Sequence, residues 1–257
     1  MRTNVIILGL CIMVLCACKN NVEKEEDNGF EASELSEDFE NGTTGLNDSK
    51  EWLNLLDAGH QDQWRGYNST EQKLPQGWSI EDAVLYSSGE GADIGGDIVF
   101  ASKEFDNFEL QLEWKLSKGG NSGIFYHILE AEAYKAPYYT APEYQIIDQV
   151  GFPQKLEPWQ SIGADYAMYN PEFKEKDLKK IGEWNTSTIK FTANEVTYWL
   201  NGKKTLSFKP WTEDWKRRKS EGKWKDYPNY GQSKTGLIGL QDHGSEIWFR
   251  NIRIKEL

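Results

Sequence analysis

Hydrophobic and polar residues alternate over much of the chain, most regularly between residues 108 and 116. There, Phe, Leu, Leu, Trp and Leu take turns with Glu, Gln, Glu and Lys. Because successive side chains of a strand point to opposite faces, this run predicts one buried and one solvated face, as in an antiparallel sheet. Similar runs bounded by turn residues predict further strands, at residues 83–86, 98–101, 123–129, 143–148, 188–192, 195–200, 203–208, 237–241 and 247–254.

Two local features refine this pattern. Asn201-Gly202 separates two of the runs and predicts a two-residue hairpin turn. In the last run, Phe249 is out of phase with Ile252 and Ile254, so we expect a bulge that restores one buried face and re-aims neighbouring side chains.

Two stretches depart from the strand pattern. Residues 211–225 place Trp211 and Trp215 four positions apart among basic residues, which predicts a packed surface helix. Residues 150–181 are irregular and rich in proline, glycine and aromatic residues, and a loop of this length is usually functional. Many short strands without crossover helices predict an all-β domain of two packed antiparallel sheets, with long loops and one short helical insertion.

The first residues predict export. Arg2 precedes an apolar run at residues 5–15 that fits a signal peptide, because a bilayer span needs about 20 apolar residues. Leu15-Cys16-Ala17-Cys18 then resembles a bacterial lipobox, which implies removal of residues 1–17 and a lipid on Cys18. An ordinary secretory signal is the alternative. We expect a lipoprotein of the bacterial cell envelope, held to the outer membrane only through Cys18, on either of its faces.

An acidic tether at residues 18–48 precedes the domain at residues 49–257. Residues 19–40 contain nine acidic residues against two lysines and few hydrophobic ones, so we expect disorder there. All three cysteines lie at or before Cys18, which leaves the domain without a disulfide or a thiolate nucleophile. Residues 41–257 carry a net charge of −6, which argues against binding nucleic acid or an anionic membrane surface.

Several segments share their order and spacing with one known family. They are Trp52-Leu53-Asn54-Leu55-Leu56-Asp57-Ala58-Gly59, Trp64-Arg65-Gly66, Asp106-Asn107-Phe108-Glu109-Leu110, Asn121-Ser122-Gly123-Ile124-Phe125, Glu143-Tyr144-Gln145-Ile146-Ile147-Asp148, Gly182-Glu183-Trp184-Asn185, Trp199-Leu200-Asn201-Gly202, Gly239-Leu240-Gln241-Asp242-His243-Gly244 and Phe249-Arg250-Asn251-Ile252-Arg253-Ile254. From about residue 50 onward the chain resembles the 3-keto-disaccharide hydrolase family, also called the 3-keto-glucoside 1,2-lyase/3-keto-2-hydroxy-glucal hydratase domain. The resemblance implies a concanavalin A-like jelly-roll sandwich.

The resemblance also implies chemistry on sugars already oxidised at C3. The C3 ketone acidifies the C2 proton, a base removes it, and the group on C1 leaves with help from an acid. Water then adds across the double bond, so that the sum is glycoside hydrolysis. Such a route needs a base, an acid and a group that stabilises an enediolate oxygen. The sequence has no dinucleotide fingerprint, so a separate sugar 3-oxidoreductase is the implied partner.

The run 143–148 holds the first candidate site residues. Glu143 and Gln145 face one side of an ideal strand and Asp148 the other. A buried carboxylate is costly unless it is paired or used, so we predict a catalytic Glu143 and a substrate-binding Gln145. Asp148 joins them as a catalytic residue only past the strand end or through a bulge, and capping of the next turn is its alternative. A wet edge strand is the alternative for the whole run.

Other candidates lie near predicted strand ends. His243 is a candidate acid, base or metal ligand, and Gln241 and Asp242 beside it are predicted to bind substrate. Asn121 could donate to a sugar hydroxyl or an enolate, with a turn as its alternative. Arg250, at the phase slip, could polarise the ketone or instead pair with an acidic residue such as Asp242.

The long loop contributes Trp159 and Tyr166, which could wall a sugar site or simply pack, because aromatic faces stack on sugar rings. No cofactor is evident. A divalent metal is conceivable, but its four candidate ligands share no spacing typical of a metal site: Glu143, Asp148, Asp242 and His243.

Two other functions stay open. A non-catalytic carbohydrate-binding module would use the same aromatic and polar groups without turnover. A conventional glycosidase would need two carboxyl groups roughly 5 Å or 6.5–9.5 Å apart across one cleft. The opposite facing of Glu143 and Asp148 on an ideal strand argues against that pair.

Overall fold

The computed structural model describes residues 51–91 and 96–257. The predicted signal peptide (residues 1–17) and the whole acidic tether (residues 18–48), Cys18 included, lie outside the described residues, and they stay predictions. None of the helices within the two described ranges combines the length and the apolar content that a membrane crossing requires.

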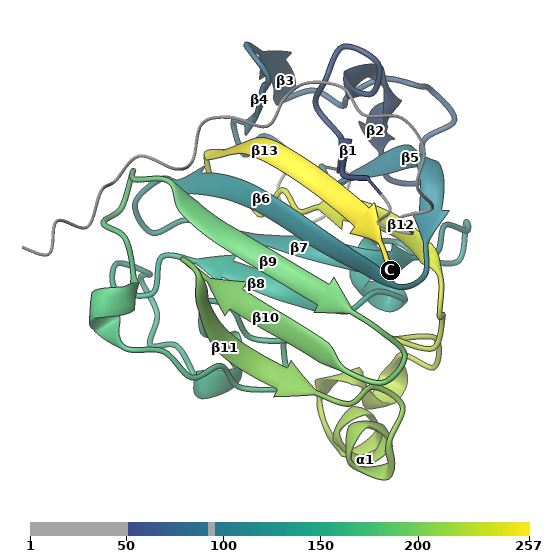
Figure 1. Cartoon of the computed structure of the whole chain (residues 1–257), viewed down its shortest axis with the longest axis vertical. Helices are drawn as coiled ribbons and strands as arrows, with labels where there is room; N and C mark the ends of the chain where they lie inside the picture. The colour runs from purple at the N-terminus through teal and green to yellow at the C-terminus, as the bar shows by residue number, and fades with distance from the viewer. Residues whose placement is uncertain (1–50, 92–95) are drawn as a thin grey trace, which may run out of the picture. The chain divides into compact units, whose positions relative to one another are not determined.

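The larger of two antiparallel sheets contains eight strands in the described residues. Seven follow the order β11-β10-β9-β6-β13-β4-β3, and β1 pairs with β13. Their bounds are β1 Leu53–Asn54, β3 Trp78–Glu81, β4 Val84–Ser87, β6 Phe108–Leu116, β9 Asn185–Phe191, β10 Val196–Leu200, β11 Lys203–Phe208 and β13 Ile247–Glu256. In Figure 1 this sheet lies in front of the smaller one.

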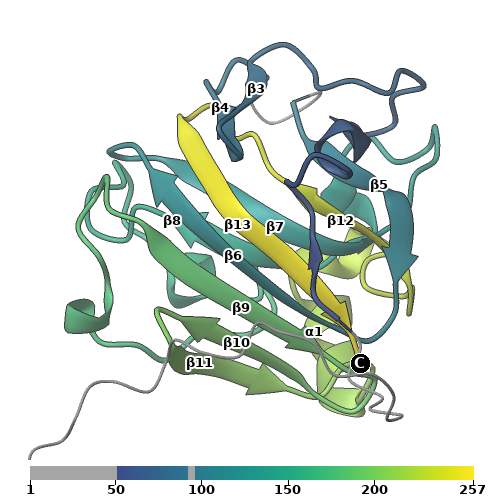
Figure 2. The same ribbon diagram turned by 45° about the horizontal axis from the view of Figure 1, so that its top comes forward.

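The smaller sheet has the order β2-β5-β12-β7-β8. Its strands are β2 Trp64–Gly66, β5 Ile98–Phe105, β7 Asn121–Ile128, β8 Glu143–Ile147 and β12 Gly236–Leu240. Figure 2 shows β7, β8 and β12 running behind β6 and β13. The predicted all-β sandwich of two packed sheets with one helical insertion is confirmed.

The strand pattern explains how the two sheets share a core. In β6 every second residue from Phe108 to Leu116 is buried, as the alternation predicts. These side chains join one cluster with Tyr144 and Ile146 of β8 in the other sheet. Because neighbours along a strand point to opposite faces, Glu143 and Gln145 must face away from this core.

The two predicted local features are present. Asn201 and Gly202 connect β10 to β11. In β13 the pairing with β6 shifts between Arg250 and Arg253. The shift returns Ile252 and Ile254 to the buried face, as expected from the phase slip.

The predicted helix is shorter than residues 211–225. It forms α1, Glu213–Glu221, which begins after Thr212, whose side chain accepts a hydrogen bond from the Trp215 amide. After Gly222 the chain enters a 3₁₀ turn, η5, Lys223–Asp226. The long segment 150–181 contains only two short 3₁₀ turns, η3 Pro158–Gln160 and η4 Glu175–Asp177, and is otherwise irregular, as predicted.

Candidate active site

A cavity of about 270 Å³ lies beside the polar face of β8. This volume is close to the lower end of the range of about 300–1,000 Å³ that is typical of small-molecule sites. Strands β7 and β8, the residues after β12, the long loop, η5 and the 3₁₀ turn η2 (Pro137–Tyr139) all contribute to its lining. The lining residues are Asn121, Tyr138, Glu143, Gln145, Tyr166, Lys223, Trp224, Gln241 and His243.

Strand alternation brings Glu143 and Gln145 into this cavity. Both side chains are buried, with relative exposures of 4% and 2%. Gly123 of β7 pairs with Gln145 and leaves room for the neighbouring carboxylate. A Cβ atom at position 123 would lie 2.3 Å from Glu143 Oε1 and 2.8 Å from its Cγ. Because glycine has no side chain, position 123 leaves the space that the Glu143 carboxylate occupies.

Burial has the largest effect on the pKa of Glu143. It raises the pKa of the carboxyl group to about 8, because a charged form is poorly solvated there. The positive charge of Lys223 opposes this effect, while Asp97 and Asp165 reinforce it. A carboxyl group with this pKa can both accept and release a proton near neutral pH, as a general base requires.

Three side-chain amide oxygens in the cavity lack hydrogen-bond partners. Six buried side-chain oxygens in the described residues have none, and three of them are Asn121 Oδ1, Gln145 Oε1 and Gln241 Oε1. The Gln145 Nε2 group donates to the carbonyl of Gln160 at 3.3 Å, which orients that side chain. Buried acceptors without partners are costly, so these groups are arranged for a ligand that carries hydroxyl groups.

The long loop also covers the free edge of β8. The Tyr166 amide donates to the carbonyl of Glu143 at 3.0 Å, and the Gln145 amide donates to the carbonyl of Ala164 at 3.0 Å. This pairing places the Tyr166 ring at the cavity wall. Trp159 packs against that ring edge to face, with ring centres 5.3 Å apart, and it lines a different cavity. It therefore does not wall the Glu143 cavity and shows its alternative, packing.

The segment after β12 places Gln241 and His243 at the cavity. The backbone carbonyl of Gln241 accepts a hydrogen bond from Ser122 Oγ at 2.7 Å, and the backbone amide of Gln241 donates to the Gly123 carbonyl at 3.0 Å. His243 is partly exposed, at the cavity rim. Asp242 points elsewhere: its buried carboxylate accepts from the amides of Gly91 and Gly244. Asp242 therefore orders loops instead of binding substrate as predicted.

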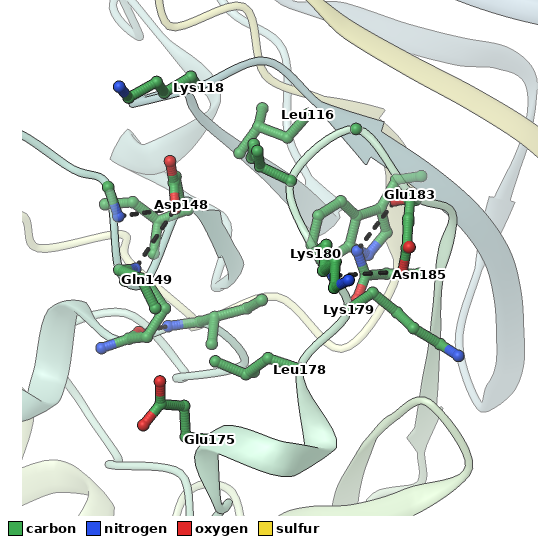
Figure 3. Close-up of a pocket in the computed structure, with 17 residues that line it drawn as sticks. Leu116, Lys118, Asp148, Gln149, Glu175, Leu178, Lys179, Lys180, Glu183 and Asn185 are labelled. Carbon is green, nitrogen blue, oxygen red and sulfur yellow. Dashed lines mark hydrogen bonds between the residues drawn. The ribbon is translucent and has the colours of Figure 1, made fainter. Parts of the chain in front are cut away.

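Asp148 lies outside the cavity that contains Glu143. It lines a second, largely apolar cavity of about 380 Å³, which Leu178 and Asn185 also line (Figure 3). Its carboxylate accepts hydrogen bonds from the amides of Gly119 and Gly151, both at 2.8 Å. Asp148 therefore does not join Glu143 and Gln145 as the catalytic prediction requires, because the residue follows β8 on the opposite face. Its carboxylate caps the next turn, which was the alternative.

We expect Asp148→Ala to lower the free energy of unfolding by about 1–3 kcal/mol, because two partly buried backbone amides lose their acceptor. Activity should be unchanged, since this carboxylate does not reach the Glu143 cavity. Urea unfolding and steady-state kinetics on the same preparations would check both expectations. Asp148→Asn keeps one acceptor oxygen and should lose less stability. A variant that keeps its stability but loses activity would contradict this assignment.

Arg250 belongs to the larger sheet and is also absent from the cavity. Its Nε donates to Glu113 Oε2 at 2.7 Å, and its guanidinium lies 4.1 Å from the centre of the Trp184 ring. Arg250 is therefore not placed to polarise a ketone in the Glu143 cavity, and the structure instead shows its alternative, pairing with an acidic residue. The bulge shifts the pairing only after Arg250, so the phase slip does not turn this side chain inward.

The four metal-ligand candidates are not gathered in one place. Only Glu143 and His243 line the cavity, while Asp148 and Asp242 cap loops. Across residues 51–91 and 96–257, no three His, Cys, Asp or Glu side chains form a group that could hold a metal ion.

Three cavity residues were not identified from the sequence: Tyr138, Lys223 and Trp224. Trp224 is buried, donates from Nε1 to the Tyr166 carbonyl at 3.0 Å and stacks on Tyr230 with ring centres 4.1 Å apart. Lys223 and Trp224 fell within the expected surface helix, whose early end turns both toward the cavity. Gly222, a helix-ending residue, is the sequence signal that marks this end.

The chain is similar in sequence and fold to known proteins. A family model described as a 3-keto-alpha-glucoside-1,2-lyase-like domain matches residues 51–255. The 3-keto-disaccharide hydrolase of Bacteroides thetaiotaomicron is 34% identical over 235 residues, which cover 82% of this chain and 80% of that protein.

Two crystal structures from Parabacteroides distasonis, both provisionally assigned as glycosyl hydrolases, are also similar. The first has 40% identity and a TM-score of 0.73, over 80% of this chain and 94% of its own. The second has 27% identity and a TM-score of 0.62, over 80% of this chain and all of its own.

Proposed function

The chain belongs to the 3-keto-alpha-glucoside-1,2-lyase-like family, and from this membership and the Glu143 cavity we propose that it cleaves glycosides that carry a ketone at C3. The observation that carries the proposal is the placement of a buried carboxyl group among three side-chain amide oxygens that lack hydrogen-bond partners. Such a cavity offers one proton acceptor and several hydrogen-bonding groups for sugar hydroxyls, which is what an elimination route needs.

In the proposed reaction, Glu143 removes the C2 proton of the substrate. The electron pair of the C2–H bond forms a C2–C3 double bond, and the ketone oxygen becomes an enolate oxygen. When the ketone re-forms, the pair moves to a C1–C2 double bond and the C1–O bond to the leaving group breaks. Hydration of that double bond returns a proton to C2 and a hydroxyl to C1, so the sum is hydrolysis.

Other lining residues take the remaining roles in this proposal. His243, at the rim, donates a proton to the departing oxygen. Asn121, Gln145 and Gln241 bind hydroxyl groups and fix the ring relative to Glu143. A separate oxidoreductase supplies the 3-keto sugar, because the sequence lacks a dinucleotide fingerprint.

The lining of the cavity distinguishes this route from that of a conventional glycosidase. That mechanism needs two carboxyl groups facing one bond. Glu143 is the one carboxyl group among the described residues that line this cavity. The elimination route needs only one, since the ketone supplies the acidity at C2.

Incubation of the purified protein with a 3-keto-glucoside in deuterated buffer tests the proposal. We expect deuterium at C2 of recovered substrate or product, and release of the group from C1, both followed by mass spectrometry and NMR. The same glucoside with an intact C3 hydroxyl is the control and should remain unchanged. Binding without exchange or cleavage on several 3-keto-glycosides would instead support a carbohydrate-binding module.

A further inference from the structure

The proposed reaction places negative charge on the C3 oxygen as the C2 proton leaves. A preorganised positive group at that oxygen lowers the barrier, often more than any other single contribution. The sequence offered Arg250 for this task, but the structure places it on the other sheet. Lys223 is the one ammonium or guanidinium group among the described residues that line the cavity.

We propose that Lys223 is a catalytic residue, which contacts the C3 oxygen of the substrate and stabilises its charge while Glu143 takes the C2 proton. This inference rests on the proposed function. Two groups of opposite charge then act in one step. The Glu143 carboxylate accepts the proton, and the Lys223 ammonium group donates a hydrogen bond to the oxygen that receives the electron pair.

The backbone around Lys223 is fixed by its neighbours. Gly222 ends α1, and its amide donates to the Arg218 carbonyl. A Cβ atom at position 222 would lie 2.6 Å from that carbonyl oxygen, so a larger residue would disturb this turn. On the other side, the buried Trp224 is held by its hydrogen bond to Tyr166 and by its stacking on Tyr230. Position 223 is thus anchored from both ends.

The side chain of Lys223 is guided toward the cavity by aromatic rings. Its Nζ lies 4.2 Å from the centre of the Tyr166 ring and 5.0 Å from that of Trp224. Both rings line the same cavity. Cation–π attraction holds an ammonium group over such faces, and it strengthens when water is excluded. A bound sugar would exclude water at this rim.

The charge of Lys223 also acts on Glu143. It is the largest influence that lowers the pKa of this carboxyl group, against the raising effect of burial. The two groups therefore interact across the cavity. A substrate between them would have its C2 proton on one side and its C3 oxygen on the other.

The variant Lys223→Gln tests whether Lys223 contacts the substrate or acts only by lowering the pKa of Glu143. We expect Lys223→Gln to lower kcat and the rate of C2 exchange together by roughly 10- to 100-fold. This is less than the usual cost of about 10²–10³-fold for loss of an oxyanion-stabilising group, because this side chain lies at the rim. KM should change little, since the charge develops after substrate binds. Lys223→Arg keeps a charge at this position and should recover part of the loss.

Lys225→Gln is the matched control, because this lysine belongs to the same 3₁₀ turn, is exposed and does not line the cavity. It should exchange and cleave like the unaltered protein. Thermal unfolding of each variant would show that the fold is intact.

Two outcomes would overturn the assignment while leaving the proposed function in place. One is unchanged C2 exchange in Lys223→Gln. The other is a full recovery of its rate at higher pH, because Lys223 would then act only by lowering the pKa of Glu143. An unaltered protein that neither exchanges nor cleaves 3-keto-glucosides would instead contradict the proposed function itself.

Discussion

Glu143→Gln is expected to lower kcat/KM on a 3-keto-glucoside by about 10³-fold, within the range of about 10²–10⁴ for loss of a general base. Glutamine keeps the size of the side chain and can hydrogen-bond, but it cannot take the C2 proton. Deuterium exchange at C2 should fall by the same factor, since this step depends on that transfer. Glu132→Gln, which alters an exposed carboxylate outside the cavity, is the control.

The pH dependence of kcat/KM is a second test of the role of Glu143. In the unaltered protein, kcat/KM should rise as the pH approaches about 8, because Glu143 must lose its proton to act as a base. In Glu143→Gln this rise should be absent. A variant that retains both the exchange and the rise would contradict the role of Glu143.

The difference in stability between Glu143→Gln and the unaltered protein should depend on pH with a definite sign. Burial raises the pKa of Glu143 from 4.5 to about 8 in the folded state, so between these values the folded chain holds a proton that the unfolded chain releases. The unaltered protein therefore loses stability as the pH rises through this window. Glutamine has no proton to lose, so the variant should gain relative stability from pH 5 to pH 8.5, by up to about 1.4 kcal/mol per unit of pKa shift. Thermal unfolding at the two pH values measures this difference.

The fold and part of the lining of the Glu143 cavity follow from local patterns. Period-two alternation is a property of the strand itself, so it gave β6 its bounds and put Glu143 and Gln145 on one face. The phase slip in β13 gave the bulge for the same reason. Gln241 and His243 were predicted near a strand end, and both line the Glu143 cavity.

The residues that were misplaced depend on structure beyond one strand. Asp148 follows the strand, where the turn and not the alternation sets its direction. Arg250 sits before the shift in pairing, and only the partner strand shows where that shift falls. Lys223 reaches the cavity because a helix ends at Glu221 and the chain folds back, which no periodic pattern describes.

Gly123→Ala is expected to lower kcat/KM by at least about 10²-fold, because a displacement of about 1 Å is enough to cost that much. The added methyl group would lie 2.3 Å from Glu143 Oε1, so the carboxylate must move away from the position that β8 gives it. Crowding of this kind in a packed interior should also lower the free energy of unfolding by about 1–3 kcal/mol. Kinetics on a 3-keto-glucoside and urea unfolding would measure the two effects.

A double-mutant cycle separates displacement of Glu143 from general damage to β7. In a Glu143→Ala background the new methyl group meets no carboxylate, so Gly123→Ala should then cost little stability. Gly59→Ala is the control, since a Cβ atom there makes only an ordinary contact of 3.5 Å with Asp57. If Gly123→Ala lowers stability equally in both backgrounds, then the methyl group disturbs the sheet itself. In that case the loss of stability would not come from displacement of the Glu143 carboxylate.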